Sequence, residues 1–162
     1  AIGSRVAELC HLFGCEIAAY DLFPKKNAPE YLHYGTLEEV LSKSDIVTLH
    51  CPLTEDSRNL INQDRIAQTK KGAILINAAR GPIVDSKALA DALNSGYLRG
   101  AGVDVFEMEP PLPMDHPLLH SINTIVTPHI AFASDESMEI RAEIVFENIQ
   151  KWMNKEQVNI IL

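Results

Sequence analysis

A run of four apolar residues at positions 73–76 is the strongest constraint on the fold of this chain. A run of that length without alternation predicts a strand buried on both faces, as in a parallel sheet. Asn77 and two alanines then lead to Arg80, and Gly81 with Pro82 ends the strand. Arg80 is therefore expected just beyond a carboxyl end, where open α/β sheets bind their ligands. The alternative is an exposed arginine in a surface ion pair.

Strand-like and helix-like segments alternate along the rest of the chain. The strands are expected at residues 16–20, 45–51, 73–77, 101–106 and 124–127, and the helices at 2–13, 36–43, 63–69, 86–95 and 134–153. Residues 22–35 contain two prolines and are expected to form a loop. Thr36, followed three positions later by Glu39, has the pattern of a capping box. This alternation predicts an α/β fold with a doubly wound parallel sheet and right-handed crossovers.

Composition narrows the classes of function. With 162 residues, 46% of them hydrophobic, the chain is long enough for one domain with a sizeable core. A net charge of −8 argues against a nucleic-acid partner, and no apolar run approaches the ~18 residues of a membrane span. The three cysteines show no metal-ligand spacing, so reduced thiols, a cytoplasmic location and no metal site are expected.

Chemically active side chains follow the predicted strands. Because parallel strands end at the same edge of a sheet, these side chains are expected to meet in one crevice. The residues in question are Asp21, His50, Pro52, Arg80, Asp104, Glu109 and His129.

Asp21 suggests which cofactor this crevice would bind. It follows Gly3 by about 20 positions, the spacing at which an acidic residue in a dinucleotide fold accepts hydrogen bonds from ribose hydroxyls. Its charge would repel a 2′-phosphate, which favours NAD over NADP. Gly3 alone is a weak signal, and a turn or helix-capping aspartate is the alternative.

Arg80, Glu109 and His129 form a chemically complete set. A histidine carries protons near neutral pH, and a carboxylate partner orients its ring and raises its pKa. An arginine holds a carboxylate while it polarises a neighbouring carbonyl. Beside a nicotinamide, such a set reduces a 2-keto acid to a 2-hydroxy acid. His50 is a further candidate for lining the cofactor pocket, whereas His11 and His33 are interpreted as structural.

Five segments together carry a family resemblance. They read A-I-G-S-R-V-A, H-C-P-L-T-E-D-S-R-N-L-I-N, K-K-G-A-I-L-I-N-A-A-R-G-P-I-V-D, G-V-D-V-F-E-M-E-P and T-P-H-I-A. In this order, over most of residues 1–133, the chain resembles the NAD-binding domain of the D-isomer-specific 2-hydroxyacid dehydrogenases. The resemblance implies a Rossmann-like fold, NAD as the cofactor and an oxidoreductase that interconverts a D-2-hydroxy acid and its 2-keto acid.

The resemblance also implies roles for individual residues. Arg80 would bind the substrate, Glu109 would be the carboxylate partner and His129 the acid/base, with Asp104 meeting the nicotinamide carboxamide. Family members commonly form homodimers through this domain. The cofactor-binding set implied is Ala1, Ile2, Gly3, Asp21, Pro52, Ala78, Ala79, Arg80, Asp104 and His129.

The chain departs from the family pattern at its beginning. The family's first strand, two motif glycines and N-terminal substrate domain would precede residue 1, so we expect a piece of a longer protein. Residues 1–133 would be a truncated NAD-binding domain, and residues 134–162 would lead back toward the substrate domain. The strands at 16–20 and 73–77 are then expected to lack a common neighbour, which leaves the sheet gapped or favours exchange of elements between two copies.

Two functional readings follow from this departure. Residues 1–162 alone are expected to bind NAD weakly and to lack activity, while the longer protein is an enzyme. A non-catalytic NAD-sensing or dimerisation module of the same fold is the alternative. The identity of the 2-hydroxy acid is not determined by these residues.

Overall fold

The computed structural model describes residues 2–108 and 111–160. The chain divides into two compact units, residues 1–128 and residues 129–162. Each unit is considered by itself below.

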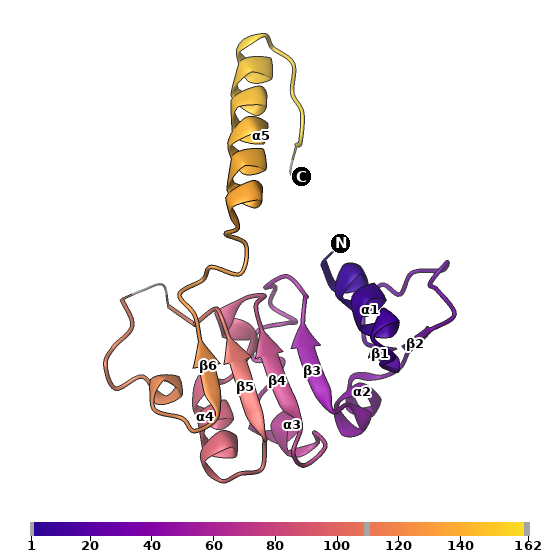
Figure 1. The fold of residues 1–162 in the computed structure, drawn as a ribbon, viewed down its shortest axis with the longest axis vertical. Coiled ribbons are helices and arrows are strands. Elements are labelled where there is room, and N and C mark those ends of the chain that lie inside the picture. Colours follow the sequence, from indigo (N-terminus) through magenta and orange to yellow (C-terminus); the bar gives the residue numbers. More distant parts are fainter. Residues whose placement is uncertain (1, 109–110, 161–162) are drawn as a thin grey trace. The chain divides into compact units, whose positions relative to one another are not determined.

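Short strands and helices alternate through the first unit (Figure 1). They are α1 (Ile2–Leu12), β1 (Ile17–Ala19), β2 (Leu32–Tyr34), α2 (Leu37–Lys43), β3 (Ile46–Leu49), α3 (Gln63–Ala67), β4 (Ile74–Asn77), the 3-10 turn η1 (Gly81–Ile83), α4 (Ser86–Asn94), β5 (Gly100–Val103), the 3-10 turn η2 (Pro117–Leu119) and β6 (Thr124–Val126).

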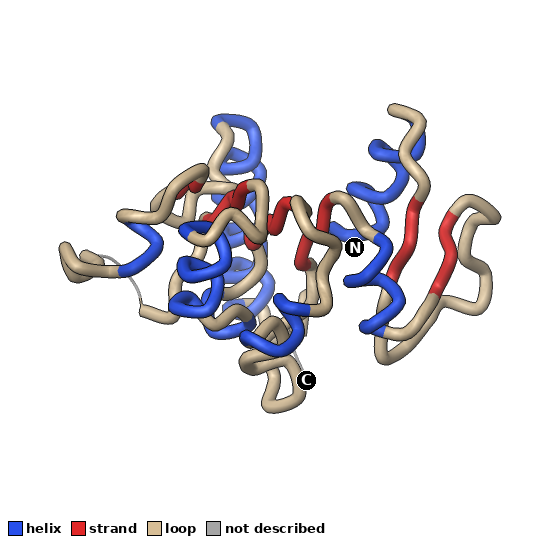
Figure 2. Tube along the Cα trace, turned by 90° about the horizontal axis from the view of Figure 1, so that it is seen from below, coloured by secondary structure: helices blue, strands red, loops and turns tan. Residues whose placement is uncertain are grey.

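The strands form two separate parallel sheets. β1 pairs with β2, and β3, β4, β5 and β6 pair in that order. The two groups of strands stand apart in Figure 2. The predicted α/β class, the parallel strands and the gap in the sheet are therefore confirmed.

Two predictions about strands were wrong, and one caused the other. Residues 32–34 form β2 within the segment expected to be loop, because a strand of three residues is too short to show a period of two. Missing β2 shifted the strand count by one. The unpaired edges at the gap belong to β1 and β3, whereas β4, predicted to lack a neighbour, lies between β3 and β5.

The larger sheet buries one face. Its inward residues pack against α2, α3 and α4 in a single apolar core, which includes Leu41, Val47, Leu75, Leu89, Leu93 and Val103. On the opposite face, Ile46, Ile76 and Ile125 remain 55%, 37% and 73% exposed. The prediction that residues 73–76 are buried on both faces was therefore wrong within the part of the chain described. A run of apolar residues does not reveal whether a second layer covers the sheet.

Helix ends follow local chemistry. Thr36 and Glu39 form the predicted capping box at the start of α2. The Asp85 side chain caps α4 by accepting a hydrogen bond from the Ala88 N–H, and Gly96 follows the helix with a positive φ of 71°. These signals lie within a few residues of each end, which is why they could be predicted.

The second unit consists mainly of α5 (Asp135–Met153). Ser134 caps it in a reciprocal arrangement with Ser137. None of its residues is buried, and its large apolar side chains, such as Phe146 and Trp152, are exposed. Over the described residues, no helix has both the length and the apolar character required to cross a bilayer.

Candidate active site

The carboxyl ends of β3, β4, β5 and β6 lie along one edge of the sheet, because all four strands are parallel (Figure 1). Main-chain hydrogen bonds continue the pairing past the last strand residues. The Asp104 N–H donates to the Asn77 carbonyl at 2.9 Å, and the Thr127 N–H donates to the Val103 carbonyl at 3.0 Å. The segments that follow these strands are therefore held side by side.

Asn77 fixes the turn that carries Arg80. Its buried side-chain amide donates through Nδ2 to the Arg80 carbonyl at 3.0 Å, and its Oδ1 accepts from the Ala79 N–H at 3.1 Å. The turn formed by Ala78, Ala79 and Arg80 thus has a set main-chain path. This role of Asn77 was not predicted from the sequence, although an asparagine before a turn is a known signal for such bonds.

Arg80 lies at the surface of this edge. Its side chain is exposed, and its Nη1 donates to the Ala79 carbonyl at 2.7 Å. Directly after it, Gly81 contacts the main chain that follows β5: a Cβ on Gly81 would lie 1.8 Å from both the carbonyl carbon and oxygen of Phe106. Only glycine permits this approach. The turn after β4 is thereby tied to the segment after β5.

Asp104 is buried at the end of β5. Its Oδ1 accepts a hydrogen bond of 2.5 Å from the Thr127 hydroxyl, which comes from the segment after β6. A carboxylate held this way has a set orientation, since a charged acceptor strengthens the bond. Thr127 is a second supporting residue that sequence analysis missed.

Hydrogen bonds within the loop after β3 also fix the shape of that loop. The buried Ser57 hydroxyl donates to the Pro52 carbonyl and accepts from the Thr54 N–H, both at 2.7 Å. Pro52 therefore starts a loop of set shape at the same edge as Arg80 and Asp104.

The residues nearest the gap fit a dinucleotide. A Cβ on Gly3 would lie 3.1 Å from the Cβ of His50, so this glycine allows α1 to approach the end of β3 closely. The first turn of α1, which begins at Ile2, contains no acidic residue and so suits an anionic group at the helix start. Close packing of the helix against the strand is what the third glycine of a dinucleotide motif provides.

Asp21 is the second residue after β1 and is exposed. Its Oδ1 accepts a hydrogen bond from the Phe23 N–H at 2.8 Å, as the turn interpretation expects. This bond engages one carboxylate oxygen and orients the group, which remains compatible with accepting bonds from a ribose.

The charge of Asp21, after β1, affects the pKa of Cys51, after β3. Burial raises the pKa of the Cys51 thiol, and the negative charge of Asp21 adds to this effect. Burial lowers the pKa of His50, so its imidazole is neutral near pH 7. The Asp21 carboxylate is therefore close enough to the end of β3 to influence Cys51.

Three of the predicted residues are not among the described residues of the first unit. His129 belongs to the second unit, where it has a left-handed φ of 56° and its ring meets Phe132 edge-on at 5.8 Å. Ala1 and Glu109 lie outside the described residues. Among the residues that are described, no group of three histidine, cysteine or acidic side chains is arranged to hold a metal ion.

Comparison with known families identifies the domain. The family model of the D-isomer specific 2-hydroxyacid dehydrogenase NAD binding domain matches residues 1–131. The chain belongs to this family. The predictions of a Rossmann-like fold and of NAD as the cofactor of the domain are confirmed by this membership.

Individual relatives of this NAD-binding domain agree with the family. The chain is 43% identical over 150 residues to a glyoxylate reductase of Korarchaeum cryptofilum, covering 91% of this chain and 45% of that protein. It is 37% identical over 161 residues to a hydroxypyruvate reductase of Blautia hydrogenotrophica, covering 99% of this chain and 50% of that protein.

A solved structure also supports membership of this family. A D-lactate dehydrogenase from Lactobacillus jensenii, determined with NAD+, superposes with a TM-score of 0.89 at 33% identity, covering 99% of this chain and 52% of that one. The chain thus spans about half the length of the relatives it matches.

Proposed function

We propose that the full-length protein carrying this chain is an NAD-dependent oxidoreductase that interconverts a D-2-hydroxy acid and its 2-keto acid. The observation that supports this most strongly is the braced edge of the sheet. Arg80 and Asp104 follow neighbouring strands; the buried Asn77 side chain fixes the main chain at Arg80, and the Thr127 hydroxyl holds the Asp104 carboxylate. An active site requires such preorganisation, whereas an arginine in a surface ion pair does not.

Gly3, Asp21, Pro52 and Asp104 are the residues proposed to hold NAD. Bound there, the nicotinamide supplies a hydride to the 2-keto acid or accepts one from the 2-hydroxy acid. Ala1, Ile2, Ala78 and Ala79 are proposed to line the same site.

The protein's own side chains then bind the acid and move the proton. Arg80 would grip the substrate carboxylate with its guanidinium fork and polarise the adjacent carbonyl. His129 would give a proton to the carbonyl oxygen during reduction and take it back during oxidation. Glu109 would orient the histidine and favour its protonated form.

The relatives named above reduce glyoxylate or hydroxypyruvate, and the solved relative is a lactate dehydrogenase. We therefore propose a small 2-keto acid as the substrate. We further propose a homodimer joined through this domain, a cytoplasmic location, and a division of labour in which residues 1–133 bind NAD and residues 134–162 lead toward a substrate domain.

A histidine substitution in the full-length protein tests this function. NADH consumption is followed with glyoxylate, hydroxypyruvate and pyruvate. His129→Ala is expected to lower turnover by about 100-fold or more, the scale of general acid–base catalysis, while NADH binding measured by calorimetry stays unchanged. His120→Ala, whose Nε2 contacts the Met114 carbonyl in the loop before β6, is the matched control and keeps its activity.

Two results would contradict the proposal. Failure of the unsubstituted protein to oxidise NADH with any 2-keto acid removes the activity itself. A rate that is the same in His129→Ala and in the unsubstituted protein removes His129 from its role.

A further inference from the structure

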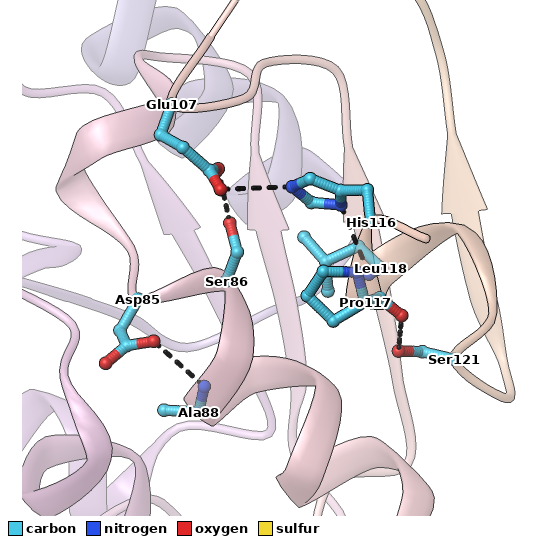
Figure 3. Close-up of polar contacts among 8 residues, drawn as sticks. All are labelled: Asp85, Ser86, Ala88, Glu107, His116, Pro117, Leu118 and Ser121. Carbon is cyan, nitrogen blue, oxygen red and sulfur yellow. Dashed lines mark hydrogen bonds and ion pairs between the residues drawn. The ribbon is translucent and has the colours of Figure 1, made fainter. Parts of the chain in front are cut away.

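A polar cluster behind the candidate site has no part in the function proposed above. It consists of Ser86, Glu107 and His116 (Figure 3). The Ser86 hydroxyl donates to Glu107 Oε2 at 2.7 Å, and His116 Nε2 lies 3.1 Å from Glu107 Oε1. Both oxygens of one carboxylate are therefore engaged by partners from different parts of the chain.

The ring of His116 is held in one orientation. Its residue is only 5% exposed, and its Nδ1 accepts a hydrogen bond of 3.3 Å from the Leu118 N–H. Because Nδ1 accepts, the neutral ring carries its proton on Nε2 and donates it to Glu107. Phe106 packs edge-on against the same ring with centroids 5.3 Å apart.

Glu107 is accordingly a fixed anion. Burial by itself raises the pKa of its carboxyl, but the hydrogen bonds from Ser86, the main chain and His116 outweigh burial and lower the pKa below its ordinary value. An ionised carboxylate with two strong donors resists displacement.

The cluster connects to Arg80 through a short strap, residues 80–86, which runs from the turn after β4 to the first residue of α4. Near its start, Gly81 rests against the main chain of Phe106 and Glu107. At its end, Ser86 is bonded to the side chain of that same Glu107. The strap is thus tied at two points to the segment that follows β5.

We propose that Glu107, held by Ser86 and His116, is a positioning residue for Arg80. This inference rests on the proposed function, in which Arg80 binds the substrate carboxylate. Among the described residues, the Arg80 guanidinium makes its hydrogen bond to its own neighbour, the Ala79 carbonyl. The guanidinium is therefore held against the main chain at the point where the strap begins, and Glu107 fixes where that strap lies.

A pair of substitutions at Ser86 in the full-length protein tests the inference. Ser86→Ala removes the hydroxyl, and Ser86→Thr keeps it. A lost hydrogen bond to a charged group corresponds to about a tenfold change, so Ser86→Ala is expected to raise KM for the 2-keto acid about tenfold. The KM for NADH should not change, and Ser86→Thr should restore the original KM for the acid.

A double-mutant cycle separates positioning from a general structural role. If Ser86 acts through Arg80, Ser86→Ala should change kcat/KM for the acid about tenfold in the original background and leave it unchanged in an Arg80→Ala background. Glu107→Gln, which keeps the shape of the side chain, should behave like Ser86→Ala and provides a second route if that variant folds poorly.

The outcomes distinguish the two proposals. An active protein in which Ser86→Ala and Glu107→Gln leave KM for the acid unchanged overturns the inference alone. An equal effect in both Arg80 backgrounds also overturns it. An unsubstituted protein that reduces no 2-keto acid overturns the proposed function and the inference with it.

Discussion

Gly81→Ala adds a single methyl group, yet it is expected to distort the candidate site. The added Cβ would lie 1.8 Å from the carbonyl carbon and oxygen of Phe106 and 2.5 Å from the nitrogen of Glu107. All three are main-chain atoms, so no side-chain rotation can relieve the overlap. Reaching an ordinary contact of about 3.5 Å requires the two segments to separate by roughly 1.7 Å.

That displacement has a cost in stability and in function. We expect the free energy of unfolding to fall by about 3 kcal/mol, the upper end of the range for overpacking a well-filled site. Because Arg80 directly precedes Gly81, we also expect kcat/KM for a 2-keto acid to fall about 100-fold, as misplacement of a binding group by about 1 Å can do.

Gly102→Ala is the matched control on β5. Its added Cβ would meet only Ile76 side-chain carbons at 4.0 Å, which is an ordinary contact. This variant should be as stable as the original or slightly more so, because alanine restricts the unfolded chain. Thermal unfolding and steady-state kinetics of both variants in the full-length protein make the comparison. Equal midpoints and equal kcat/KM for Gly81→Ala and Gly102→Ala would refute the reasoning.

Two further predictions concern titratable groups. The lowered pKa of Glu107 means that its ionisation stabilises the fold above the unfolded value of about 4.3 and that this contribution is lost as the pH falls through the folded value. Urea unfolding at a series of acid pH values should therefore show a steeper loss of stability in the original protein than in Glu107→Gln, and identical slopes would contradict this. The raised pKa of Cys51 keeps its thiol protonated at neutral pH, so iodoacetamide should modify it more slowly than the exposed Cys15. Peptide mass spectrometry would detect the difference, and equal rates at the two thiols would show that burial does not protect Cys51.

The corrections in this protein have two causes. The strand at 32–34 was missed because three residues carry too little periodicity, and its absence from the count moved the expected gap from β3 to β4. The outer face of β4 was expected to be buried because an apolar run looks alike whether one or two layers cover it. Both errors concern which segments are neighbours in space, since the type of each longer element was predicted correctly.

Some residues of the candidate site could be predicted from the sequence, and others could not. Arg80 and Asp104 could be predicted because strand ends on a parallel sheet share one edge, and the resemblance to a family assigned them roles. Asn77 precedes a turn and could have been recognised from that signal, whereas Thr127 and Ser57 could not be predicted, although each of the three braces a segment of that edge. A single threonine or serine has no distinctive pattern in the sequence, and its role depends on a partner several residues or a whole strand away.

The sequence by itself determined the kinds of element, their caps and the chemistry that follows each strand. Those properties depend on residues within a few positions of one another, as the Thr36 capping box and the glycine after α4 illustrate. Only the tertiary structure decided that the sheet is split between β1 and β3, and that the Arg80 strap is tied at Gly81 and Ser86 to the segment after β5. Those contacts join residues about 20 or more positions apart, so they arise from packing and pairing across the fold, which no local pattern encodes.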